Sequence, residues 1–161
     1  MEAIIINNSK DLKIDEEKIK KAANFIFAQL EKEENSEINI VFVGKEEIRE
    51  LNLKYRGKDN YTDVLSFSYL EDKDVFGFIG DSENFKNEFG FFTVGEIMIC
   101  PQAALENIAK YNKKFELEHE LIFLIIHGML HIYGYDHEND SDNEAMDIKQ
   151  DELMEKVSST I

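Results

Sequence analysis

The sequence contains little cysteine or proline and has no long hydrophobic run. Cys100 is the only cysteine among 161 residues, so no disulfide can form within the chain, and this usage fits a reducing compartment. The longest apolar run, 121–126, is much shorter than the roughly 18 residues of a membrane span and leads straight into His127. The N-terminus also lacks the basic flank and cleavage site of a signal peptide. We therefore expect a cytoplasmic protein with no membrane partner.

Basic residues are scarce, and arginine most of all. The net charge is −16, from 34 acidic and 18 basic residues, and such a field repels RNA, DNA and anionic membranes. A nucleic-acid partner would need a local basic patch, and DNA is not expected as a partner. Planar, bidentate recognition of a phosphate has two candidates, because Arg49 and Arg56 are the only arginines.

Hydrophobic periodicity predicts a single domain over residues 1–161, with α+β architecture and a small mixed sheet of four strands. The predicted strands cover 3–7, 38–43, 64–68 and 95–100, and the five predicted helices cover 15–33, 45–55, 101–111, 115–133 and about 142–157. The only proline, Pro101, suits the first turn of the third helix, and Asp142 is the predicted cap of the last. Residues 69–92 show no sustained period and are predicted to form an irregular insertion or a hairpin.

Three histidines follow a metal-ligand pattern. His127 and His131 are four residues apart on a predicted helix, so both imidazoles lie on one face, about 40° and roughly 6 Å apart. His137 would lie on the opposite side if the helix continued, but Gly134 can take the left-handed conformation that ends a helix. Three neutral imidazoles with one position left for water are typical of a catalytic zinc site. We therefore predict a metal-dependent hydrolase that holds one Zn²⁺, or another divalent transition metal, per chain.

Other interpretations of these histidines have to be weighed. Two histidines at helical spacing are more often ordinary surface or core residues, and only the third histidine and the glycine favour a metal site. A structural zinc site would need a fourth ligand, for which Asp136 is an awkwardly placed candidate. A zinc protease would have glutamate where this chain has Gly128, so a peptidase is disfavoured. His119 lies among three glutamates and is predicted to lie on a solvated face.

The sequence resembles the YbeY family of bacterial endoribonucleases and rRNA maturation factors, whose fold is zincin-like. The histidine run is one matching motif. The others are Leu51-Asn52, Tyr55-Arg56-Gly57-Lys58-Asp59, Thr62-Asp63-Val64-Leu65-Ser66-Phe67 and Gly95-Glu96-Ile97-Met98-Ile99. This chain has Glu96 where the family usually has aspartate, and Tyr61 and Ser68 where the family often has proline. The resemblance covers most of the chain.

The resemblance implies a single-strand-specific, metal-dependent endoribonuclease that acts in rRNA processing, namely 16S rRNA 3′ end maturation, and in ribosome biogenesis. It implies the metal ligands His127, His131 and His137. It also implies that Arg56 is catalytic. Arg56 follows a short predicted helix and precedes a glycine, a position that suits the stabilisation of phosphate charge. The alternative from the residues alone is that Arg56 is a surface arginine in a helix-ending turn. Thr62 and Asp63 either orient a site residue or begin the third strand. The alternative functions are a ribosome-assembly binding factor with a structural metal and a metal-dependent hydrolase of another substrate.

A small basic region is the expected contact with RNA. Lys54, Arg56 and Lys58 surround the turn after the second predicted helix, and Lys113 and Lys114 precede the histidine helix. Two or three phosphate contacts from this region would bind free RNA only modestly. We therefore expect single-stranded rRNA to be presented by a partner, the ribosomal small subunit.

Overall fold

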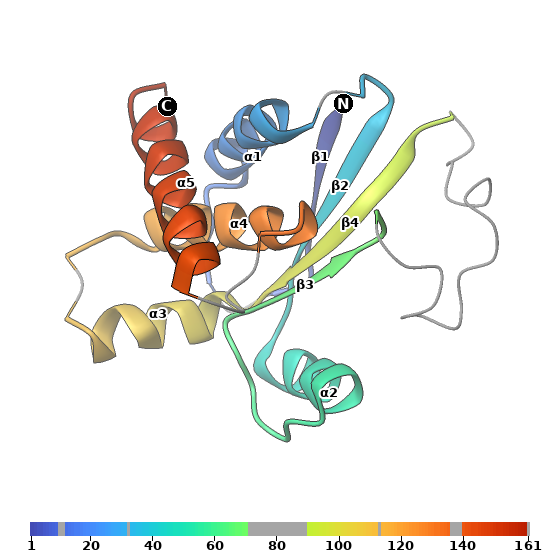
Figure 1. Cartoon of the computed structure of the whole chain (residues 1–161). Helices are drawn as coiled ribbons and strands as arrows, with labels where there is room; N and C mark the ends of the chain where they lie inside the picture. Colours follow the sequence, from blue (N-terminus) through green and yellow to red (C-terminus); the bar gives the residue numbers. More distant parts are fainter. Residues whose placement is uncertain (10–11, 32, 71–89, 113, 136–139, 161) are drawn as a thin grey trace.

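The computed structural model confirms the predicted α+β class. It describes residues 1–9, 12–31, 33–70, 90–112, 114–135 and 140–160, except for the side chains of 140–142. Four strands and five helices form this part of the chain (Figure 1). The strands are β1 (Glu2–Asn7), β2 (Ser36–Phe42), β3 (Val64–Ser68) and β4 (Phe92–Ile99). The helices are α1 (Glu16–Leu30), α2 (Lys45–Arg56), α3 (Pro101–Lys110), α4 (Leu117–Ile132) and α5 (Asp140–Ser158).

The sheet is mixed, with strand order β1-β2-β4-β3. β1, β2 and β4 run parallel, and β3 runs antiparallel to β4 at one edge. Parallel neighbours need a crossover, which α1 supplies between β1 and β2. Ile40 and Val41 of the central β2 point to opposite faces of the sheet and are both buried, as expected for a parallel strand covered on both faces.

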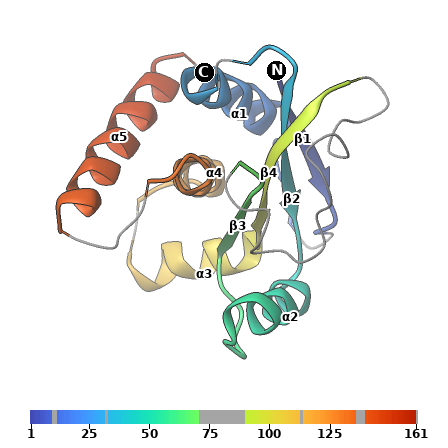
Figure 2. The same ribbon diagram turned by 45° about the vertical axis from the view of Figure 1, so that its right-hand side comes forward.

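Helix α4 forms the centre of the protein. Figure 2 looks almost along its axis and shows α1, α3, α5 and the sheet around it. Most residues of α4 are buried, which agrees with a sequence that is apolar nearly all round. Gly128 allows the helix to approach the sheet closely, because a Cβ at this position would lie 2.9 Å from Ile97 Cγ2 of β4. The histidine helix is therefore held rigidly against the sheet.

Helix α2 lies apart from the other four helices (Figure 1). It packs on a smaller apolar cluster, which consists of Val41, Val43, Ile48, Leu65, Met98, Cys100 and Ala103. Cys100 is fully buried there as a free thiol. This arrangement places the C-terminal end of α2 beside β3.

Several element boundaries differ from the predicted ones. Helix α1 ends at Leu30, where the chain turns extended at Glu31, instead of continuing to residue 33. Helix α5 begins at Asp140, so the prediction that Asp142 caps it is wrong. An acidic residue is favourable at the cap position and also within the first helical turn, because both positions lie at the positive end of the helix dipole. Strand β4 begins at Phe92, three residues before the predicted start, and most of the predicted irregular segment, 71–89, lies outside the described residues. No helix of the described ranges is long and apolar enough to cross a membrane.

Candidate active site

Two of the three predicted histidine ligands converge on one point. His127 Nε2 and His131 Nε2, both on α4, lie 3.1 Å apart, and the two rings are nearly perpendicular at 79°. Two nitrogens that bind one tetrahedral zinc ion at about 2.0–2.1 Å lie roughly 3.3 Å from each other. The spacing of the pair therefore fits a shared divalent metal ion, as the i, i+4 pattern predicted.

The end of α4 has the turn that the sequence analysis assigned to Gly134. This glycine has φ +84°, and its N–H donates to His131 O at 3.1 Å, while Tyr135 N–H donates to Leu130 O at 3.0 Å. These two hydrogen bonds form a Schellman motif, which reverses the chain direction at a helix end. His137 itself lies in 136–139, outside the described residues, and its place at the metal stays a prediction. Within the ranges that the structure describes, no group of three potential metal-ligating side chains occurs.

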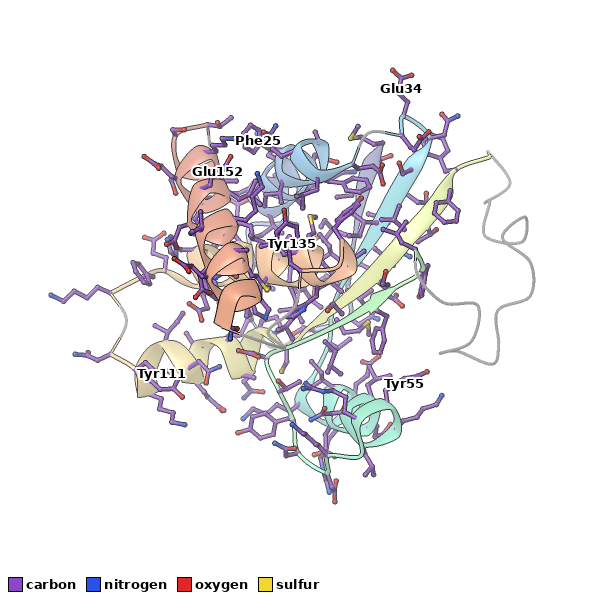
Figure 3. The ribbon with its side chains drawn as sticks, in the orientation of Figure 1. Phe25, Glu34, Tyr55, Tyr111, Tyr135 and Glu152 are labelled. Atoms are coloured by element: carbon purple, nitrogen blue, oxygen red, sulfur yellow. The ribbon has the colours of Figure 1, made fainter. Side chains whose placement is uncertain are left out.

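Arg56 faces the same cleft as the histidine pair. The cleft has a volume of about 580 Å³, and its walls are Arg56 and the residues from Thr62 to Ser66 on one side and His127 and His131 on the other. Arg56 is exposed at the last turn of α2. Its neighbour Tyr55 is labelled beside α2 in Figure 3. The ring of Tyr55 contacts that of Phe67 of β3 edge to face at a centroid distance of 5.1 Å, which ties this turn to the strand. The structure thus brings together two motifs that are about 70 residues apart in the sequence.

Thr62 and Asp63 form the turn into β3 and also line the cleft. Asp63 is anchored to its surroundings, because Asn107 Nδ2 of α3 donates to its carboxylate at 2.9 Å and Cys100 N–H donates to its carbonyl at 2.8 Å. Thr62 Oγ1 lies 3.3 Å from Asp63 Oδ1. These contacts favour the interpretation that the two residues form the turn that leads into the third strand, and they fix this part of the cleft wall.

Gln150 was not singled out by the sequence analysis. It lies on α5, is 7% exposed, and its Oε1 is 3.0 Å from His127 Nδ1. An amide oxygen only accepts, so the contact requires a proton on Nδ1 and leaves the Nε2 lone pair for a metal. A signal was present in the sequence, because Gln150 interrupts the otherwise apolar buried positions Met146, Leu153 and Val157 of α5.

Comparisons with known proteins show the family of the chain. A family model described as Endoribonuclease YbeY matches residues 4–158. The chain belongs to the YbeY family. It is 37% identical over 158 residues to Endoribonuclease YbeY of a Thermoanaerobacter species, covering 96% of both chains, and 36% identical over 163 residues to that of Clostridioides difficile, covering 99% of both. The solution structure of TM1509 from Thermotoga maritima superposes with a TM-score of 0.62 at 31% identity, over 98% of this chain and 90% of that one.

Ser68 links strand β3 to the end of α4. Its hydroxyl donates to Ile132 O in the last turn of α4 at 3.0 Å. A carbonyl in the last turn of a helix has no partner within that helix, so this bond satisfies it. Ser68 thereby ties β3, which forms one wall of the cleft, to the end of the helix that forms the other.

The packing of α4 on the sheet explains why Gly128 stands where a zinc protease has its glutamate. Gly128 faces Ile97 of β4, so a side chain at this position would collide with the sheet. His119, the fourth histidine, is stacked on Phe115 with ring centroids 4.2 Å apart and does not line the cleft. It is only partly exposed, because this stacking covers part of the imidazole that was predicted to be solvated.

Proposed function

We propose that this YbeY protein is a metal-dependent endoribonuclease that cleaves single-stranded RNA. The observation that carries the proposal is the single cleft that Arg56 shares with His127 and His131. Family membership over nearly the whole chain supports it, because the relatives are named endoribonucleases. The cleft is open and has polar walls, as a phosphodiester substrate requires.

His127 and His131 would hold the metal ion, with His137 as the proposed third ligand. Zinc suits a site of three imidazoles, and one Zn²⁺ per chain is our proposal, although other divalent transition metals accept the same ligands. When bound, a divalent ion acts as a Lewis acid toward a phosphoryl oxygen or lowers the pKa of a bound water. Gln150 would keep His127 in the tautomer that binds the ion.

Arg56 would stabilise the phosphodiester during cleavage. An extra negative charge develops on the phosphoryl oxygens when the phosphorus atom is attacked, and a guanidinium can donate two hydrogen bonds to them at once. Arg56 is exposed at a helix end, so its side chain is free to reach a substrate in the cleft without losing an internal ion pair within the described residues. Arg49 differs, because its guanidinium is bonded to Asp59 and Glu46.

Ribosomal RNA, presented by the ribosomal small subunit, is the proposed substrate, and 16S rRNA 3′ end maturation is the proposed step. The net charge of −16 opposes binding of free RNA. A ribosomal particle would supply additional contacts and raise the effective concentration of the RNA end at the cleft. Action in the cytoplasm follows from this substrate.

A cleavage assay with purified protein tests the proposal. A single-stranded oligoribonucleotide should be cleaved internally, cleavage should stop after chelation and dialysis, and added Zn²⁺ should restore it. The all-deoxy oligonucleotide of the same sequence is the control and should stay intact. A protein that binds RNA and one zinc ion tightly but leaves both oligonucleotides intact would be the alternative, a binding factor with a structural metal.

A further inference from the structure

A second groove continues from the cleft of the histidines and Arg56. Its volume is about 480 Å³, and it shares Thr62 and Asp63 with that cleft. Its other walls include Asn60 and Tyr61 of the loop before β3, and Glu106 of α3. A strand of RNA whose phosphate lies at Arg56 can therefore extend into this groove without leaving the protein surface.

Tyr61 is held in a fixed position at the groove. Its hydroxyl donates to Glu106 Oε2 at 3.0 Å, and Lys45 Nζ lies 4.5 Å from the centroid of its ring. Lys45 also forms an ion pair with Glu106, so the three side chains hold one another. The ring is nevertheless 43% exposed. An exposed aromatic ring that is already ordered loses little conformational entropy when a flat ligand stacks on it.

The loop that carries Tyr61 is also anchored. Asn52 of α2 is 2% exposed, and its side-chain Nδ2 donates to Asn60 O at 2.7 Å. This bond joins α2, the helix of Arg56, to the loop at the residue before Tyr61. The distance from the arginine to the aromatic ring is therefore set by the fold.

The charges of the groove favour a base over a phosphate. Glu106 and Asp63 present carboxylates to it, while Lys110, the one cation among its described lining residues, has its Nζ 5.1 Å from the ring centroid of Tyr111, which lies outside the groove. The hydrogen bond from Lys45 holds the pKa of Glu106 below its usual range, so this carboxylate stays ionised at neutral pH. Two carboxylates disfavour a phosphate between them. The amides of Asn60 and Asn107 and the ring of Tyr61 instead offer hydrogen bonds and a stacking surface to a neutral heteroaromatic ring.

We propose that this groove binds the nucleobase of a nucleotide next to the cleaved phosphodiester, with Tyr61 as its stacking platform. Lys45 lies against one face of the ring and leaves the other to the base. The inference rests on the proposed function, since it assumes an RNA strand in the adjacent cleft. Stacking of one base on an aromatic side chain corresponds to about a 5- to 150-fold change in affinity when the ring is removed.

A fluorescence titration tests the stacking directly. The chain contains no tryptophan, so Tyr61→Trp introduces a single reporter into the groove. A 2′-O-methyl hexanucleotide, added to protein from which the metal has been removed by chelation so that no cleavage occurs, should quench this tryptophan in a saturable way. Ile148→Trp is the matched control, because Ile148 of α5 is 62% exposed and lines neither the groove nor the cleft; it should show no saturable quenching.

Affinity measurements on the native ring complete the test. By anisotropy of the labelled hexanucleotide, Tyr61→Ala should bind about 5- to 150-fold more weakly, while Tyr61→Phe, which keeps the ring and loses the bond to Glu106, should fall between. Ile148→Ala should bind like the parent. Saturable quenching at position 61 without RNA cleavage by the parent would support the subsite and contradict the proposed nuclease. The subsite alone would be overturned if the parent cleaves RNA but Tyr61→Trp is not quenched and Tyr61→Ala keeps the parental affinity. Absence of any RNA binding would overturn both the subsite and the proposed nuclease.

Discussion

Gln150 Oε1 lies 3.0 Å from His127 Nδ1, and this contact joins α5 to the histidine helix. The two residues come from opposite sides of the segment 136–139, which contains His137. Groups that hold the second nitrogen of a metal-binding imidazole fix its tautomer and its orientation. Helix α5 is therefore part of the site and also covers the core.

The first prediction is that Gln150→Leu binds Zn²⁺ about 10- to 100-fold more weakly than the parent, because leucine fills a similar volume but cannot accept from His127. Isothermal titration calorimetry measures the affinity. Gln150→Glu should bind at least as tightly as the parent, since it keeps an acceptor. Gln29→Leu, an exposed glutamine of α1, is the control. An unchanged affinity of Gln150→Leu would mean that the contact does not orient the imidazole.

The second prediction concerns the ligands themselves. His127→Ala, His131→Ala or His137→Ala should each lose tightly bound metal, because two protein ligands are too few to hold the ion, while the fold is kept. Elemental analysis of the purified variants measures this. His119→Ala should keep one equivalent of metal, since His119 stacks on Phe115 and lies outside the cleft. Full zinc content in His131→Ala would refute the assigned ligand set.

The third prediction separates Arg56 from the only other arginine. Arg56→Ala should lower kcat for RNA cleavage by about 10²- to 10³-fold while it stays metal-loaded, because the guanidinium acts on the developing charge and not on the fold. Arg56→Lys should recover part of the loss. Arg49→Ala, on the same helix, removes a surface ion pair with Asp59 and should leave kcat unchanged. Parental cleavage by Arg56→Ala would exclude a catalytic role.

The fourth prediction is that single-stranded RNA binding depends weakly on salt. Four basic residues of the expected RNA-contact region are exposed, namely Lys54, Arg56, Lys58 and Lys114. Among these four, Arg56 alone lines the cleft, and Lys113 lies outside the described residues. Two or three phosphate contacts give a log–log slope of about −1.4 to −2.1, at roughly −0.7 per phosphate. A salt titration by anisotropy, repeated with the small ribosomal subunit, measures it. A slope steeper than about −4 would require more phosphate contacts than this region provides.

The fifth prediction is a pH dependence of stability from Glu96. Burial raises the pKa of this carboxyl, although the hydrogen bond from Tyr69 at 3.3 Å opposes the shift. A raised pKa favours the protonated form in the folded state. The free energy of unfolding therefore falls as the pH rises from 4.5, the ordinary pKa of the carboxyl in the unfolded chain, through its higher pKa in the folded protein. Glu96→Gln should therefore have a higher Tm than the parent at pH 7.5 and an equal one at pH 4. Exposed Glu155→Gln should change neither, and an unchanged Tm of Glu96→Gln at pH 7.5 would contradict the prediction.

Much of the fold and half of the site are local consequences of the sequence. The four strands, the five helices and the mixed sheet agree with the predicted α+β class, because each element carries its own periodicity. The approach of His127 to His131 follows from one turn of helix, and the turn at Gly134 from the single residue type that accepts its φ. Interactions within a few residues need no knowledge of the rest of the chain.

The tertiary structure decided everything that joins distant segments. Sequence spacing could not bring Arg56 to the histidine cleft, place Gln150 against His127, or tie Ser68 to Ile132. Nor could it show a groove beside Tyr61. Each of these relationships depends on how α2, β3 and α5 pack around the buried α4, and that packing arises from many weak apolar contacts that no single motif records.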